Sequence, residues 1–143
     1  MEEETGVPAA ALELHDGRII TGKTSDLLGP SAALLLNALK ELAGIEHGIH
    51  VISPEAIEPI QKLKVEYLGS ANPRLHTDEI LIALSISASH DENARKAMAQ
   101  LSKLKGCQAH TSVMLAAVDR LQFRRLGIEI TCQPKYENKR LYH

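Results

Sequence analysis

The chain has 143 residues, of which 44% are hydrophobic, 24% charged and 3% aromatic, and its formal net charge is −2. This composition is typical of a single globular domain with an aliphatic core. It argues against a dedicated nucleic-acid binder, which needs a basic surface or exposed aromatic rings. No apolar run approaches the ~20 residues of a membrane span, and the acidic residues 1–4 do not resemble a signal peptide. We therefore expect a cytoplasmic protein with neither nucleic-acid nor membrane partners.

The first predicted element is a β-hairpin over about residues 11–23. Asp16-Gly17 lies between two short apolar stretches and favours a two-residue turn in which both central residues adopt a positive φ. Residues 17–24 (GRIITGKT) also match the phosphate-loop pattern G-x-x-x-x-G-K-[ST]. A phosphate loop follows a strand and opens a helix, whereas Ile19 and Ile20 belong to the hairpin. We interpret the match as accidental, and a nucleotide loop is the alternative.

A buried helix and a strand are predicted next. Pro30 and Gly44 are typical of the first turn and the C-terminal end of a helix, which we place over residues 31–43. Residues 49–52 are short and rich in β-branched side chains, which predicts a strand.

Two further helices are predicted around a loop. Ser53-Pro54 begins a helix that reaches about residue 68 with a kink at Pro59, and residues 69–76 form a turn-rich loop. Residues 80–88 fit either a buried strand or a buried helix, and the cap signal that begins at Thr77 favours the helix.

The last third of the chain predicts a helix, a strand, a short helix and a strand. The first helix covers about residues 91–105 and ends at Gly106; its packed face contains Ala94, Ala97, Met98, Leu101 and Leu104. The strand over 108–115 points Val113 and Leu115 inward. Asp119 caps the short helix, which ends at Gly127, and residues 128–132 alternate as the final strand.

This order of elements predicts an α/β fold. Strands separated by helices need crossover connections, so part of the sheet must be parallel. We expect a three-layer α/β sandwich with a mixed sheet that begins with the β-hairpin. Residues 1–10 form a lead-in, residues 11–134 the single domain, and residues 135–143 a polar tail that is either frayed or docked on a partner.

The chemistry-bearing residues identify no metal site and no cofactor. Cys107 and Cys132 match neither a metal spacing nor a disulfide framework, so we expect buried, inert thiols. The seven histidines match no metal signature; they are His15, His47, His50, His76, His90, His110 and His143.

The densest polar cluster is Arg74, His76 and Asp78, at the predicted start of a helix. A permanent cation and a group that titrates near neutrality, beside free helix N–H groups, suit a small anionic ligand. The alternative is that Thr77 and Asp78 only cap the helix.

Four phrases resemble a known bacterial family. They are residues 22–31 (GKTSDLLGPS), 72–79 (NPRLHTDE), 100–107 (QLSKLKGC) and 139–143 (KRLYH). Together they resemble the C-terminal part of the DUF1846 family, also called UPF0371, over nearly the whole chain. The resemblance implies a longer protein with further domains upstream and a topology similar to the cytidine-deaminase-like sandwiches. The zinc signature of those deaminases is absent from this sequence.

The resemblance brings no catalytic residues, and fold similarity does not carry activity. Some family members carry an ATP-dependent peptidase label. Three interpretations stay open: a structural or interaction domain that packs on sibling domains or a second copy; a small-molecule or nucleotide-binding module of a larger enzyme; and an ATPase or hydrolase that rests only on residues 17–24. The sequence does not decide whether the chain is an enzyme.

Overall fold

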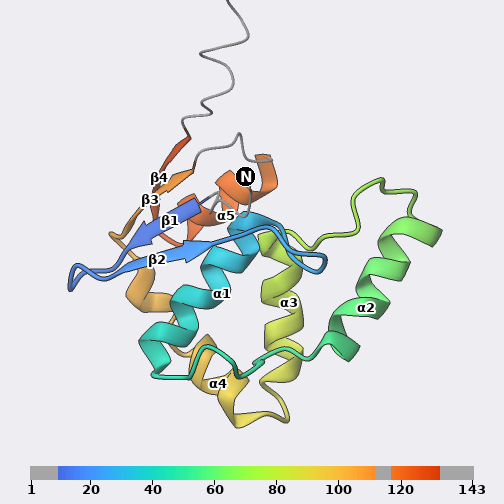
Figure 1. Cartoon of the computed structure of the whole chain (residues 1–143), viewed down its shortest axis with the longest axis horizontal. Helices are drawn as coiled ribbons and strands as arrows, with labels where there is room; N and C mark the ends of the chain where they lie inside the picture. Colours follow the sequence, from blue (N-terminus) through green and yellow to red (C-terminus); the bar gives the residue numbers. More distant parts are fainter. Residues whose placement is uncertain (1–9, 112–116, 133–143) are drawn as a thin grey trace, which may run out of the picture.

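The computed structural model describes residues 10–111 and 117–132 and begins with the predicted hairpin (Figure 1). Strands β1 (Ala10–Glu13) and β2 (Ile19–Gly22) pair antiparallel, with Leu12 opposite Ile20. The turn differs from the prediction. Leu14 donates its N–H to the Arg18 carbonyl, so the loop between these two residues has three residues rather than the expected two. Gly17 donates its N–H to the Leu14 carbonyl and has φ of 91°, which only glycine adopts without strain.

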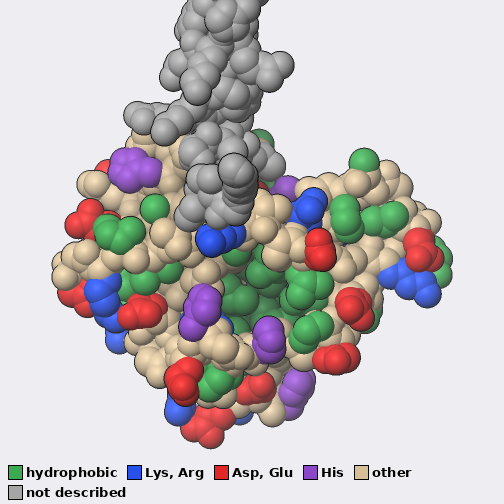
Figure 2. All heavy atoms as spheres, viewed as in Figure 1, with side chains coloured by type: hydrophobic (Ala, Val, Ile, Leu, Met, Phe, Trp, Pro, Cys, Tyr) green, Lys and Arg blue, Asp and Glu red, His purple; other side chains and the backbone are tan. Residues whose placement is uncertain are grey.

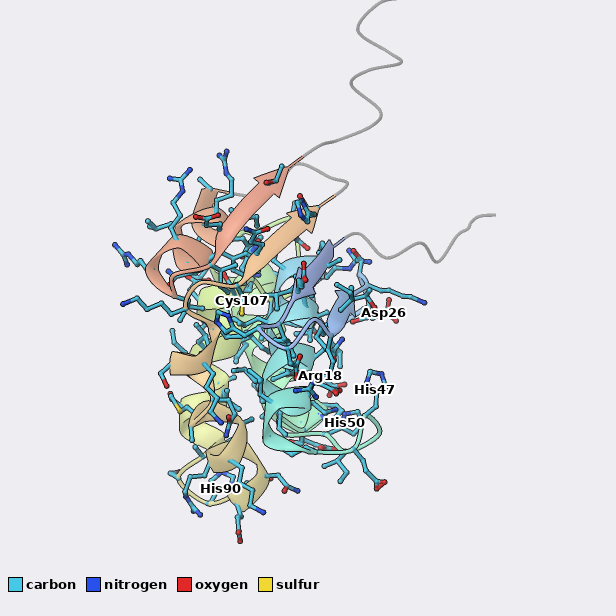
Figure 3. All side chains as sticks on the ribbon, turned by 90° about the vertical axis from the view of Figure 1, so that its left-hand side faces the viewer. Arg18, Asp26, His47, His50, His90 and Cys107 are labelled. Carbon is cyan, nitrogen blue, oxygen red and sulfur yellow. The ribbon has the colours of Figure 1, made fainter. Side chains whose placement is uncertain are left out.

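An ion-pair network fixes the hairpin to the first helix, α1 (Pro30–Ala43). The Arg18 guanidinium lies 2.7 Å from Asp16 Oδ2 and 2.7 Å from Glu41 Oε2, so it bridges the turn and the helix (Figure 3). The Asp16 carboxylate also accepts the backbone N–H of Arg18, and this bond is the main reason why the pKa of Asp16 is lowered.

The region of the phosphate-loop match is therefore a turn followed by a strand. Ile19 and Ile20 lie in β2, and no helix begins at Lys23 or Thr24, since the next helix begins at Pro30. A side chain at Gly22 would place its Cβ 2.5 Å from the backbone nitrogen of Leu34. A glycine is thus required here because the backbones of β2 and α1 approach each other closely.

Within the described residues, the sheet has four strands in the order β2-β1-β3-β4. Strand β3 (Gln108–Thr111) pairs antiparallel with β1 and parallel with β4 (Glu129–Cys132). Helix α5 (Ala117–Arg125) lies between β3 and β4 in the chain, as a parallel crossover requires. The predicted α/β class and the mixed sheet are confirmed.

The two faces of the sheet differ. Leu12 and Ala109 are buried, and α1 packs on this side, with α3 (Thr77–Ser87) and α4 (Glu92–Met98) packed on α1. Helix α5 contacts both β4 and α3. The other face carries exposed polar residues, among them Glu13, Gln108 and Glu129. In the described part of the chain no helix covers that face, so the second helical layer expected for a three-layer sandwich is not found there.

The strand predicted over residues 49–52 is wrong. These residues form a loop in which Val51 and Ile52 are nevertheless buried. The β-branched side chains of this segment pack in the core although the segment pairs with no strand. The β-branched composition, which favours strands, therefore gave the wrong prediction.

The helix predictions are mostly confirmed, with two breaks. The helix that begins at Ser53-Pro54 is α2 (Pro54–Lys62), and it continues as the π-helix η1 (Leu63–Tyr67). Residues 77–87 are helical, as the cap signal favoured. The helix predicted over 91–105 is divided into α4 and the 3-10 turn η2 (Leu101–Leu104).

Apolar side chains from the described α-helices, from η2 and from the strands form the core, with Phe123 of α5 at 0% exposure. Cys107 is buried as expected, and burial raises the pKa of its thiol (Figure 3). The inward positions predicted for Val113 and Leu115 lie outside the described residues. Among the described helices, none has the length and apolar character that crossing a membrane would require.

Candidate functional site

The start of α3 meets the loop before α1 at a short parallel β-bridge between Leu28 and Leu75. Leu75 donates its N–H to the Leu27 carbonyl at 2.9 Å, and its own carbonyl accepts the Gly29 N–H at 3.2 Å. We call residues 25–29 and 72–79 the junction. It brings together two of the phrases that carry the family resemblance, although they are far apart in the sequence.

Arg74 and His76 flank Leu75 in the junction. Leu75 is fully buried, whereas Arg74 and His76 are both half-buried. The Arg74 Nε donates to the Ser25 carbonyl at 2.5 Å. Within the described residues Arg74 makes no ion pair, so its charge has no carboxylate partner there.

His76 is oriented by a buried carboxylate from α5. Its Nδ1 lies 3.1 Å from Asp119 Oδ2. Asp119 Oδ1 accepts the Thr77 backbone N–H at 2.9 Å and the Thr77 hydroxyl at 2.8 Å. Because a carboxylate accepts, the imidazole proton belongs on Nδ1. The Nε2 atom has no hydrogen-bond partner in the part of the chain that the structure describes, and the side chain is 29% exposed.

Asp78 and Glu79 are engaged by the helix start itself. Asp78 Oδ1 accepts the Glu79 backbone N–H at 2.8 Å. Glu79 Oε1 accepts the His76 backbone N–H at 2.8 Å and lies 2.9 Å from Lys64 Nζ. Lys64 is buried and also donates to the Arg74 carbonyl. The carboxylates of Asp78, Glu79 and Asp119 thus take up N–H groups of the first turn of α3.

The three predicted site residues have different partners: Arg74 donates to the Ser25 carbonyl, His76 contacts Asp119, and Asp78 accepts a backbone N–H at the start of α3. Ligand binding by the three residues stays a prediction. The expectation that Asp119 caps its own helix is wrong: it lies inside α5, and its carboxylate caps α3 instead. Sequence reasoning missed this role, and that of Lys64, because these contacts join residues distant in the sequence.

A second feature is a groove between α2 and α3. It holds a cavity of about 240 Å³. Its apolar lining consists of Val51, Ala56, Ile60, Ala83 and Ile86, and its polar lining of His50, Ser53, Ser87, His90 and Asp91. Figure 2 shows hydrophobic side chains in the hollow at the middle of this face. Asp91 is already engaged as the cap of α4.

Histidines at the groove do not form a metal site. His50 lies in the loop that follows α1, close to His47, and His90 lies lower, beyond the end of α3 (Figure 3). In residues 10–111 and 117–132, no group of three or more His, Cys, Asp or Glu side chains could hold a metal ion.

The groove is bordered by an arm that consists of α2 and η1, residues 54–67, and extends away from the body (Figure 1). Only Ile57 and Lys64 of the arm are buried. Large hydrophobic side chains are exposed at its far end and on the side of α3 beside it; they are Leu63, Val65, Tyr67, Leu68, Ile82 and Ile86.

These features define an α/β module with a mixed sheet, an apolar groove and a polar junction. The chain belongs to the DUF1846 family: the family's C-terminal domain, described as a domain of unknown function, matches residues 1–142. The resemblance of the four phrases is thereby confirmed.

Relatives extend over much more sequence than this chain. A UPF0371 protein of Corynebacterium efficiens is 63% identical over 142 residues, which are 99% of this chain and 29% of the relative. One from Corynebacterium urealyticum is 62% identical with the same coverage, and one from Streptococcus uberis is 53% identical over 140 residues, 98% of this chain and 28% of the relative. The chain therefore spans less than a third of the length of these relatives, whose names state no activity.

Proposed function

We propose that this domain is an interaction module that binds the preceding part of the longer family protein through the groove and the arm. The observation that carries the proposal is a pair of exposed isoleucines on α3: Ile86, which lines the groove and is 61% exposed, and Ile82, one turn earlier, which is 59% exposed. Apolar residues gathered on one face mark interaction sites.

The size of the cavity supports a protein partner. Cavities that hold drug-sized ligands span roughly 300–1,000 Å³, and this one has about 240 Å³. Such a volume suits a single anchoring side chain, as hot spots of protein interfaces commonly use. Large apolar side chains are also exposed at the end of the arm, at Tyr67, and directly after it, at Leu68.

The length of the relatives supports an occupant from the same chain. More than two thirds of each relative lies outside the matched region, and the family's other domains are expected upstream of it. Contacts between domains of one chain are present at high effective concentration. An exposed groove of modest size can therefore be occupied without high intrinsic affinity.

Site-specific photo-crosslinking in the complete Corynebacterium efficiens relative tests this proposal. A photoreactive amino acid is placed at the position aligned with Ile86, and in a second variant at the position aligned with Tyr67. The control carries it at the position aligned with Leu121, which is 41% exposed on α5, away from the groove. We expect intramolecular cross-links to the preceding part of the chain from the first two variants and none from the control.

Two results would overturn the proposal. Equal cross-linking from all three positions means that the groove has no specific occupant. Cross-linked species of twice the monomer mass, without intramolecular products, assign the groove to a second copy.

A further inference from the structure

The two walls of the groove are helices, and this limits the kind of segment that can occupy it. Ala56 and Ile60 line the groove from α2, and Ala83 and Ile86 line it from α3. Residues three or four positions apart lie on one side of a helix, about one turn from each other. The groove therefore follows both helices for at least one turn.

The backbone of these walls offers little to an extended segment. Most N–H and C=O groups of α2 and α3 are bonded within their own helix. Pro59 lacks the N–H that would bond to the Glu55 carbonyl, but a strand requires a row of such groups and not a single acceptor. An extended segment buried here would leave its own backbone groups without partners. A helix satisfies its backbone internally, so it can enter the groove without that cost.

The side chains of the groove also suit a helix. Ala83 and Ser87 are small and buried at its floor, so the backbone of an occupant can come close. Ile82 and Ile86 are exposed and four positions apart, which makes them a ridge that can pack between the side chains of a neighbouring helix. The cavity of about 240 Å³ then accepts one apolar side chain, in the hollow that Figure 2 shows.

The charges around the cavity define the chemistry of the occupant. Among its described lining residues, Asp91 carries the one permanent charge, and its carboxylate already accepts the N–H groups of Asn93 and Ala94. The two lining histidines, His50 and His90, lie outside α2 and α3. The walls that α2 and α3 contribute are therefore uncharged, so the contacting side of the occupant is apolar.

We propose that an amphipathic helix from the preceding part of the family protein lies in the groove, with one apolar side chain in the cavity. The proposal rests on the proposed function, which assigns the groove to that part of the chain, and it adds the kind of segment that binds. The contacting side chains of such a helix recur every three or four residues, as in other helices that bind in grooves.

The test maps photo-cross-links to single residues by mass spectrometry in the complete Corynebacterium efficiens relative. The photoreactive amino acid is placed at the position aligned with Ile86 and, in a second variant, at the position aligned with Ile60, on the opposite wall. We expect both variants to label one segment, at residues three or four apart. A spacing of two residues, or labels scattered over several segments, overturns the helix but leaves the proposed function intact. The absence of intramolecular products overturns both.

Filling the cavity tests the anchoring side chain. A leucine is introduced at the position aligned with Ala83 or, from the other wall, with the half-buried Ala56; the matched control is a leucine at the position aligned with Ala99, which is exposed at the end of α4. We expect each cavity variant to lose most of the cross-linking yield at the Ile86 position, and the control to keep it. Full yield in a folded cavity variant would overturn the anchor.

A proline in the labelled segment tests its conformation directly. It is placed in the middle of the segment, at a residue that gives no cross-link, and alanine at the same residue is the control. Because proline breaks a helix and alanine favours one, we expect proline to abolish the cross-links and alanine to preserve them. Equal yields from the two variants would overturn the helix.

Discussion

Replacing Asp119 with alanine removes three hydrogen bonds at once, and two of them serve Thr77, which is fully buried. The Thr77 N–H and hydroxyl would then have no acceptor and no access to water. A hydrogen bond to a charged group contributes about 1.5–3 kcal/mol, and a buried group left unsatisfied costs about 1–3 kcal/mol. Because the two bonds to Thr77 share one carboxylate, we expect Asp119→Ala to destabilise the domain by about 3–5 kcal/mol.

The assay is urea unfolding followed by circular dichroism, since the chain contains no tryptophan for fluorescence. Asp78→Ala is the matched control: it also removes a carboxylate from the start of α3, but one that is half-buried and makes a single bond to the next residue. We expect the control to cost about 0.5–1 kcal/mol.

A double-mutant cycle with Thr77→Val isolates the contact between the two helices. We expect a coupling of about 1–3 kcal/mol between Asp119→Ala and Thr77→Val. Similar losses for Asp119→Ala and Asp78→Ala, or a coupling near zero, would refute the reasoning that Asp119 caps α3 from another helix.

Three other substitutions test the fold. Gly17→Val should cost about 1 kcal/mol or more, because a β-branched residue resists the positive φ of the hairpin turn; an unchanged urea midpoint would contradict the turn. Gly22→Ala should cost about 1–3 kcal/mol or more, because the new Cβ meets the backbone of α1 at Leu34; normal stability would show that β2 and α1 separate easily. Leu104→Ala should cost about 2–5 kcal/mol, whereas Leu101→Ala should cost less, because Leu104 is fully buried and Leu101 is only half-buried; the reverse order in thermal unfolding would place η2 differently.

Local signals in the sequence predicted the parts of the fold that depend on local interactions. The turn residues Asp16-Gly17, the proline at the start of α1 and the Asp91 cap of α4 each act within a few residues, so their effect could be read directly. The failures arose where tertiary context decides. Residues 49–52 are buried without pairing, and residues 91–105 change from α-helix to a 3-10 turn before Leu104 enters the core.

The candidate site also contains residues that local sequence indicates and residues that only tertiary contacts reveal. Arg74 and His76 could be singled out from the sequence because both lie directly before the predicted start of a helix. Asp119 could not be assigned to them, since nothing near it in the sequence indicates that α5 approaches the start of α3. The buried Lys64 was equally hidden, because its partner Glu79 lies in another helix.

The central strands of the sheet join the two ends of the described chain. Glu13 pairs with Gln108, and Ala10 with Thr111, whereas β1 meets its other neighbour, β2, across a three-residue loop. The hairpin can form early, but its second edge stays open until roughly a hundred further residues have been synthesised. A high contact order of this kind slows folding, and it makes the helices between the strands part of the loop that must close. Removing the chain from β3 onward would therefore leave β1 with an unpaired edge, so a shortened version of the domain should associate through that strand.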